Sequence, residues 1–164
     1  MMTVVNSNSE GTLIVIPGLS RSLDTIGKHV VSFDETDGRL LAEVSSVVQR
    51  ANGPKCKRRS SRVHGRYWHW LSDTPSFGQP VMLAVEVRRF KCINCQCPQQ
   101  ALSERIDPLA AAGKRRTMRL REAQRWLGYS LGGAAAARLA GRLGMHTSRH
   151  AVLRELRERL RLPT

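Results

Sequence analysis

The sequence is poor in acidic and aromatic side chains and has no long apolar run. It contains 13 Asp and Glu against 27 Lys and Arg, and aromatic residues make up 5% of the chain. The longest apolar run near the start, Leu13 to Ile16, is far too short to span a bilayer. The basic segment of a signal peptide is also missing before it. We therefore expect a cytoplasmic protein that associates with the nucleoid and has no membrane partner.

Sequence motifs of several enzyme classes are absent as well. The chain has no glycine-rich phosphate loop, no Gly-x-Ser-x-Gly motif and no His-Glu-x-x-His motif. Its few acids are scattered, so they do not form the carboxylate triad that holds two catalytic metal ions. The sequence therefore predicts no catalytic residues and no enzymatic activity in this chain.

Positive charge is the most unusual property of the composition. The formal net charge is +14 and the isoelectric point is near 11.1. Acids outnumber bases over residues 1–48, whereas bases strongly outnumber acids from Arg50 onward. The usual partner of such a field is a polyanion, most often nucleic acid, although a ribosome or an anionic membrane surface would also satisfy it.

The N-terminal two thirds of the chain are predicted to be β-rich. Short β-prone runs at residues 29–33 and 40–44 flank an Asp/Gly-rich turn and predict a hairpin. Within residues 81–90, Val81, Leu83, Val85 and Val87 recur with a period of two, which indicates a strand, and residues 62–70 are its expected antiparallel partner.

The four cysteines lie at the ends of this predicted strand pair. Cys56 precedes one strand, and Cys92, Cys95 and Cys97 follow the other, so antiparallel pairing would bring them together. Metal ligation explains cysteines in a basic cytosolic chain better than disulfides do. Zinc takes four such ligands in a tetrahedron, and zinc ribbons supply them from two knuckles at strand ends. The sequence therefore predicts a zinc-ribbon-like module.

The first knuckle departs from the pattern, because Gly53 stands where a ribbon would hold its first cysteine. Three interpretations are open. Cys95 completes a site of Cys56, Cys92, Cys95 and Cys97. Alternatively, His64 supplies the missing ligand. In the third interpretation the zinc site is weakened or empty.

The C-terminal third is predicted to be helical. Apolar residues recur at helical spacing over residues 120–131, 136–143 and 152–160, and Gly132-Gly133 separates the first two runs. A Gly-containing turn at residues 144–147 precedes the last run, with Thr147 or Ser148 as its N-cap. Three helices with a short turn before the last are typical of a helix-turn-helix. The predicted fold class is α+β, with an N-terminal β-hairpin and a small β-rich zinc-ribbon-like module followed by this three-helix helix-turn-helix.

The division of the chain follows from these patterns. We expect a disordered leader at residues 1–12, a β-hairpin segment at 13–49, the zinc-ribbon-like finger at 50–106 and the helical DNA-binding domain at 107–164. In the helical domain, Arg149, His150 and Arg154 are exposed at the start of the last helix and are the predicted base-reading residues. The alternative is that these arginines only face solvent. Other basic residues are predicted to anchor phosphates: Arg157, Lys114, Arg115, Arg116, Arg138, Arg142, Arg58, Arg62 and Arg66.

Several of these segments resemble one protein family. The runs Arg58 to Tyr67 and Val87 to Cys92, followed by Cys97-Pro98 and Glu104-Arg105, are similar to the N-terminal region of bacterial insertion-sequence transposases of the ISL-three type. Leu13 to Leu19 and residues 147–154 also look like that family. The resemblance implies a zinc-ribbon-like finger and a helix-turn-helix that recognises terminal inverted repeats. It also implies a DDE catalytic domain afterwards, before which this chain would be truncated.

The resemblance sharpens both the metal site and the function. The family's first knuckle is Cys-Pro-x-Cys, so Gly53 replaces a ligand, while Cys92 and Cys97 keep the second knuckle and Cys95 is extra. The expected function is sequence-specific binding of double-stranded DNA at terminal inverted repeats, with zinc as the expected cofactor. The alternatives are a stand-alone repressor or competitor of the intact transposase, and a non-specific nucleic-acid-binding module. A second copy of the chain or the full-length transposase is a candidate protein partner.

Overall fold

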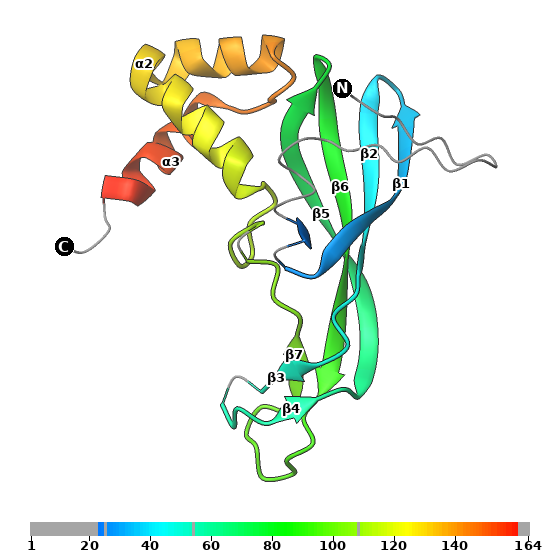
Figure 1. The fold of residues 1–164 in the computed structure, drawn as a ribbon. Helices are drawn as coiled ribbons and strands as arrows, with labels where there is room; N and C mark the ends of the chain where they lie inside the picture. Colours follow the sequence, from blue (N-terminus) through cyan, green and yellow to red (C-terminus); the bar gives the residue numbers. More distant parts are fainter. Residues whose placement is uncertain (1–22, 25, 54, 108, 161–164) are drawn as a thin grey trace.

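A long β-hairpin forms the spine of the fold (Figure 1). The computed structural model describes residues 23–24, 26–53, 55–107 and 109–160. Strands β5 (Val63–Ser76) and β6 (Gln79–Lys91) pair antiparallel along most of their length. The two residues between them, Phe77 and Gly78, both have positive φ, at 54° and 77°. Such a turn matches the twist of the flanking strands and closes the hairpin tightly.

A second hairpin lies beside the first. Strands β1 (Lys28–Thr36) and β2 (Arg39–Ser46) pair antiparallel, and Asp37 and Gly38 form a turn with positive φ. The hairpin predicted over residues 29–33 and 40–44 is therefore confirmed. Strand β2 also pairs with β6, and this pairing is parallel, with Val44 opposite Val85. The two hairpins consequently form one mixed sheet.

The far end of the long hairpin carries three short strands. The main sheet has the order β1-β2-β6-β5, and β7 (Ala101–Ser103) pairs with β6 beside this path. Strands β3 (Ala51–Asn52) and β4 (Arg59–Ser60) form a separate two-stranded sheet. We call residues 51–60 and 91–103 the knuckle end; they lie at the bottom of Figure 1.

The main core covers one face of the sheet. Alternate side chains of β2 and β6, such as Val44 and Leu83, point to this face and are fully buried. The segment after β7 crosses the same face, where Leu109 and Ala110 join the cluster. The period-two pattern of β6 is thus explained by its alternate residues Val81, Leu83, Val85 and Val87, which all belong to this core.

A buried ion pair ties the strands together near this core. Lys28 is 1% exposed, and its Nζ lies 3.2 Å from a carboxylate oxygen of Glu104 and donates to the carbonyl of Glu86 at 2.7 Å. Glu104 also accepts from the backbone N–H of Arg88 at 3.2 Å. Burial is the largest influence on Lys28 and lowers its pKa, while Glu104 opposes that shift. A buried charge requires such partners.

Helix α2 (Met118–Arg142) is anchored to β5 at its N-terminus. The Thr117 hydroxyl caps the helix by accepting from the N–H of Leu120 at 3.3 Å, and it donates to Asp73 of β5 at 2.6 Å. Arg119 also donates to Asp73, through Nε, at 2.6 Å. Because Asp73 is buried, these bonds satisfy its charge and fix the direction of the helix.

Helix α3 (Arg149–Leu160) packs closely against α2. A Cβ atom at Gly128 would lie 2.7 Å from Cγ1 of Val152, and one at Gly133 would lie 2.9 Å from Cγ of Leu153. Glycine at both positions therefore lets the helices approach. Between the helices, Arg121 donates to Glu155 at 2.9 Å, and both side chains are buried. We call residues 117–160 the helical end.

The predicted fold class is wrong. In the part of the chain that the structure describes, a mixed sheet carries two helices, and a three-helix helix-turn-helix is not formed. Gly132, with φ 73° and ψ 170°, bends α2 sharply, and helix resumes after it. The glycine pair predicted to separate two helical runs therefore does interrupt the helix, because Gly132 has non-helical φ and ψ at this kink within α2. The expected small finger is also part of a larger sheet, because β2 pairs with β6.

Some predictions fall on residues that the structure does not describe, and one concerns the N-cap of α3. The leader at residues 1–12 and the similarity at Leu13 to Leu19 lie outside the described residues. Ser148 precedes α3, and its hydroxyl accepts from the N–H of Ala151 at 3.2 Å, as expected for one of the two proposed N-caps.

Candidate metal centre and nucleic-acid interface

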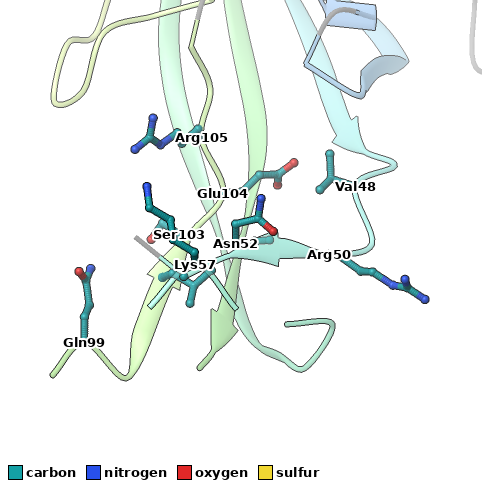
Figure 2. Close-up of a pocket in the computed structure, with 11 residues that line it drawn as sticks. Val48, Arg50, Asn52, Lys57, Gln99, Ser103, Glu104 and Arg105 are labelled. Carbon is teal, nitrogen blue, oxygen red and sulfur yellow. The ribbon is translucent and has the colours of Figure 1, made fainter. Parts of the chain in front are cut away.

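A cavity of about 640 Å³ opens beside the knuckle end, between β3 and β7 (Figure 2). Its lining includes three basic residues, Arg50, Lys57 and Arg105, together with Asn52 and Gly53. The three basic residues are exposed in the structure. The sequence did not single them out, because they lie in three separate segments that only the fold brings to one cavity.

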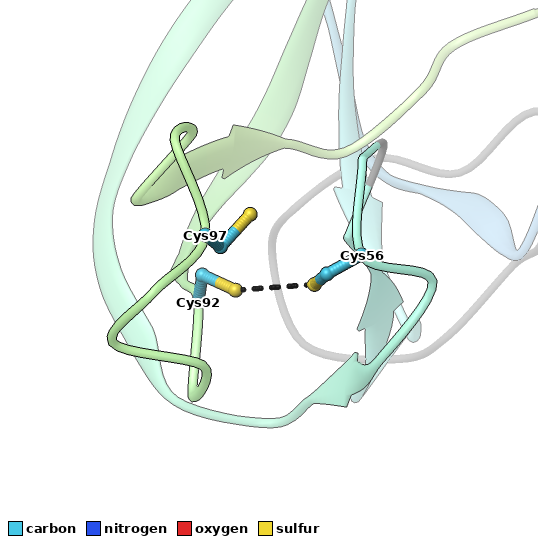
Figure 3. Close-up of side chains that lie close together, drawn as sticks. All are labelled: Cys56, Cys92 and Cys97. Carbon is cyan, nitrogen blue, oxygen red and sulfur yellow. Dashed lines mark hydrogen bonds between the residues drawn. The ribbon is translucent and has the colours of Figure 1, made fainter.

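Three cysteines converge next to this cavity. Cys56 lies in the loop between β3 and β4, Cys92 directly follows β6, and Cys97 lies in the loop before β7. Their sulfur atoms all lie within 4.8 Å of one another, and the Sγ atoms of Cys56 and Cys92 are 3.5 Å apart (Figure 3). Sulfurs on one zinc ion, at about 2.3 Å each, would be about 3.8 Å apart. The cluster therefore fits a zinc ion.

The first knuckle is a tight backbone loop. The N–H of Gly53 donates to the carbonyl of Arg58, and the N–H of Lys57 donates to the carbonyl of Gly53, both at 2.9 Å. Lys57 has a φ of 59°, which completes the reversal. This loop presents Cys56 toward the second knuckle.

The second knuckle is held by one glutamine. The side-chain nitrogen of Gln100 donates to the carbonyls of Asn94, Cys95 and Cys97, at 3.3, 3.1 and 2.7 Å. The N–H of Cys92 in turn donates to the carbonyl of Gln100 at 2.7 Å. These bonds fix the loop that carries Cys92 and Cys97.

The thiols of the two knuckles differ in acidity. A backbone hydrogen bond from Arg58 is the largest influence on Cys56, and with the hydrogen bonds of the other thiols it lowers the pKa of Cys56. At Cys92 a backbone hydrogen bond from Asn94 acts in the same direction, but burial and the neighbouring thiols outweigh it and raise the pKa. Thiolate is the form in which these cysteines would bind a metal.

The structure separates the candidate ligands into two groups. Cys56, Cys92 and Cys97 lie together, with Cys92 and Cys97 buried against Phe90 and Leu102. Cys95 is exposed, as is His64, and among the described residues neither belongs to the cluster of metal-binding side chains.

Three predicted phosphate contacts in and before β5 are accessible to solvent. Arg58, Arg62 and Arg66 are all exposed at or near the knuckle end. Arg66 also lies 3.0 Å from a carboxylate oxygen of Glu86, an ion pair that its largely exposed side chain can exchange for a phosphate. Two tryptophans on the same strand, Trp68 and Trp70, are about half exposed, at 48% and 51%. They are two residues apart, and in a strand this spacing places both side chains on the same face of the sheet, which is the sequence signal for them.

Helix α3 presents its predicted DNA contacts to solvent. Arg149, His150, Arg154 and Arg157 are exposed, and the last three line a groove of about 440 Å³ together with Leu153 and Glu158. The opposite side of the helix is buried against α2. An exposed helix face of this kind has the dimensions that the major groove admits.

The remaining predicted phosphate anchors differ in their surroundings. Arg115, Arg138 and Arg142 are exposed. Lys114, by contrast, forms an ion pair with Glu158 at 2.9 Å, and Arg116 is half-buried and donates to Gln124 at 3.1 Å. The structure thus leaves the first three freer to meet a phosphate than the other two.

Comparison with known proteins gives one finding for this region. Residues 54–95 match the family described as the zinc-finger of transposase IS204/IS1001/IS1096/IS1165. The matched segment includes Cys56, Cys92 and the hairpin between them, and it covers less than half of the chain. No curated protein matches the chain, and no solved structure matches it. No helix among the described residues is both long enough and apolar enough to cross a membrane.

Proposed function

We propose that this protein binds double-stranded DNA in a sequence-specific way, as the DNA-recognition part of a transposase that binds terminal inverted repeats. The observation that carries the proposal is the coincidence of two features. The segment similar to a transposase zinc finger contains two members of the three-thiol cluster, and exposed arginines flank that cluster. Zinc fingers of transposases imply a nucleic-acid partner, and the net charge of +14 supplies the attraction.

In this proposal, one surface contacts phosphates and another recognises bases. At the knuckle end, Arg58, Arg62 and Arg66 contact phosphates, which adds affinity without sequence information. At the helical end, Arg149, His150 and Arg154 of α3 face the major groove, where an arginine recognises guanine through two hydrogen bonds. A zinc ion at the thiol cluster would link the two knuckles and so fix the positions of the nearby arginines.

The proposal is tested by selecting preferred duplexes from a random pool with the full chain. Fluorescence anisotropy then compares a selected duplex with a scrambled duplex of equal length at fixed salt. We expect a preference of about 10³-fold or more, the lower range for specific DNA-binding proteins. Failure to enrich any sequence, with equal binding of both duplexes, would refute sequence-specific recognition.

A non-specific nucleic-acid-binding module is the second candidate function. The excess of basic residues favours it, because phosphate contacts alone account for non-specific binding. The same anisotropy experiment separates the two functions. A non-specific module binds every duplex with the same affinity and the same steep salt dependence.

A further inference from the structure

Strand β5 carries two tryptophans on the face of the sheet opposite the main core. It is the last strand in the order β1-β2-β6-β5 and so forms an edge of the main sheet (Figure 1). Leu71 of β5 pairs with Leu83 and belongs to the core, and side chains alternate between the two faces along a strand. Trp68 and Trp70 therefore point away from the core. Each is about half exposed, so this face presents two indoles to solvent.

The inner side of each indole lies toward the neighbouring strand. Trp68 is opposite Glu86 of β6, and Trp70 is opposite Ala84. Both partners are buried, at 5% and 6% exposed, although they lie on the face away from the core. Side chains that are directly opposite on one face of a sheet are close enough to pack together. The half of each indole that stays exposed is therefore available to a planar group from outside the protein.

The spacing of the two indoles suits the bases of an unpaired strand. Two residues along a β-strand span about 6.6–6.8 Å. Successive bases of a duplex rise by only about 3.4 Å. A nucleic-acid strand that places one base on each indole is therefore extended and has left the duplex stack. A duplex presents base edges in its grooves rather than base faces. The tryptophan pair consequently favours unpaired bases.

Cations flank the two tryptophans along β5. Arg66 precedes them on the same face, and its side chain is 62% exposed. One terminal nitrogen of Arg66 lies 3.0 Å from Glu86, which leaves other guanidinium N–H groups for a phosphate. Beyond the tryptophans, the N–H of Ser72 donates to the carbonyl of Arg115 at 2.9 Å, so the exposed Arg115 lies beside this end of the pair. A phosphodiester chain that crosses the pair therefore meets an arginine at either end.

We propose that Trp68 and Trp70, with Arg66 and Arg115 beside them, form a platform that binds an unpaired nucleic-acid strand by base stacking. Aromatic side chains on a positively charged surface are the combination by which proteins hold single strands without sequence preference. The excess of 27 basic over 13 acidic residues favours this polyanion over a protein partner. The platform lies on β5 and not on α3, so this inference goes beyond the proposed duplex recognition and does not depend on it.

The test compares two labelled oligomers of about 12 nucleotides, a length within the range that single-strand sites cover. Oligo(dT) carries bases, and an abasic oligomer of equal length has the same phosphates without them. We expect the full chain to bind oligo(dT) more tightly at fixed salt. Trp68→Ala and Trp70→Ala should each weaken oligo(dT) binding by about 5-fold to 150-fold, the usual effect of removing one base–aromatic contact. Neither variant should change the affinity for the abasic oligomer.

Two controls accompany these variants. Trp126→Ala removes an exposed tryptophan of α2 and should leave the affinity for oligo(dT) unchanged. Trp68→Phe keeps an aromatic ring and should recover most of the affinity that Trp68→Ala loses. Oligo(U) of the same length forms a further arm. Tighter binding of either strand than of the abasic oligomer supports the platform, and the tighter of the two identifies the strand as DNA or RNA.

A second readout does not depend on whether the alanine variants fold. The chain has three tryptophans, so in Trp126→Phe all tryptophan emission comes from Trp68 and Trp70. A base stacked on an indole quenches its emission. Oligo(dT) should therefore quench the fluorescence of this variant, and the abasic oligomer should not.

Three results would overturn the proposal. One is equal affinity of the wild-type chain for oligo(dT) and the abasic oligomer, without quenching in Trp126→Phe. Another is unchanged oligo(dT) affinity in both Trp68→Ala and Trp70→Ala. The third is self-association of the wild-type chain that Trp68→Ala abolishes and that prevents oligomer binding, which would assign this face to a second copy. Trp70→Ala should keep the preference among duplexes and Arg154→Ala should keep the affinity for oligo(dT), so failure of this proposal and failure of duplex recognition are distinguishable.

Discussion

The knuckle end and the helical end are held together differently. At the knuckle end, short strands and a small apolar cluster surround three thiols. At the helical end, α2 and α3 pack against each other through glycines and a buried ion pair. Half of the knuckle-end cluster consists of cysteines, with Phe90 and Leu102 as its buried apolar members. The helical end instead buries Leu120, Ala136 and Val152. We expect a cluster this small to depend on a metal ion as a cross-link, whereas burial and packing stabilise the helices. The comparison therefore predicts that metal loss affects one end alone.

The largest effect is expected from Cys92→Ser. Removing this thiolate leaves two ligands, so zinc affinity should fall by more than about 10²-fold, beyond the effect of outer-shell changes. Metal content per chain, measured by elemental analysis after gel filtration, should drop to background. Hydrogen exchange should become faster in β3, β4 and β7 but not in α2. Cys95→Ser is the matched control, and equal metal content in Cys92→Ser and the wild type would contradict the assigned cluster.

The next largest effect is expected from Arg121→Met at the helical end. It leaves Glu155, 6% exposed, without its partner at 2.6 Å. Breaking a buried ion pair in this way costs about 3–5 kcal/mol. Urea unfolding followed by circular dichroism measures the loss. Arg138→Met, at an exposed position, should change stability by less than about 0.5 kcal/mol. Metal affinity should be the same in both variants. If Arg121→Met lost metal affinity together with stability, the two ends would not be independent.

A third prediction concerns base reading and phosphate anchoring. Arg154→Ala should reduce the preference for the selected duplex by about 1–3 kcal/mol, because it removes a contact to a base edge. Arg115→Ala should weaken selected and scrambled duplexes equally and lower the salt slope by about one contact. Anisotropy titrations at several salt concentrations distinguish the two patterns. An equal loss on both duplexes for Arg154→Ala would reject α3 as the base-reading element.

Two glycines of α2, Gly128 and Gly141, test how closely the helices pack. In Gly128→Ala the new Cβ would crowd Val152, and overpacking of this kind costs about 1–3 kcal/mol, partly offset by the better helix propensity of alanine. At Gly141 nothing lies within 4 Å of a new Cβ, so Gly141→Ala should stabilise the protein by about 0.5–1 kcal/mol. Thermal unfolding of the two variants should therefore shift in opposite directions. Equal shifts would mean that the helices do not meet closely at Gly128.

The smallest expected effect is the pH dependence of the contact between Glu158 and its basic neighbours. The hydrogen bond from Lys114 is the largest influence and lowers the pKa of Glu158. Because the folded pKa lies below the unfolded value, the contribution is present above about pH 4.3 and is lost as the pH falls through the folded pKa. The side chain is 40% exposed, so the contribution is at most about 1 kcal/mol. Glu158→Gln should remove this part of the acid sensitivity in unfolding titrations, and an unchanged pH profile would contradict it.

The sequence predicts local features of this fold better than distant ones. The hairpins follow from alternation and turn residues that are neighbours along the chain, and the meeting of Cys56 with Cys92 follows from the antiparallel pairing of β5 and β6. The parallel pairing of β2 with β6 joins separate segments and has no local signal. The interruption at Gly132 does have a local signal, because glycine readily adopts the positive φ found at this kink.

The candidate site shows the same limit. Spacing alone left Cys95 and His64 as ligand candidates, whereas the folded loops bring three cysteines together and leave those two side chains outside. The contact between Gly53 and Cys56 depends on the shape of one tight loop. The cavity with Arg50, Lys57 and Arg105 depends on strands that meet only in the folded chain.

The central claim is that the thiol-held knuckle end forms part of a DNA-binding surface, and one titration tests it most directly. The anisotropy of a labelled selected duplex is followed with zinc-loaded protein and with protein stripped by a chelator, at the same salt concentration. The account predicts a clear loss of affinity on stripping, because Arg58, Arg62 and Arg66 lose their fixed positions. It also predicts that the affinity recovers when zinc is restored. In the Cys92→Ser variant, the stripped and the zinc-treated protein should bind the duplex with the same affinity. Identical affinities of the stripped and zinc-loaded wild-type chain would contradict it.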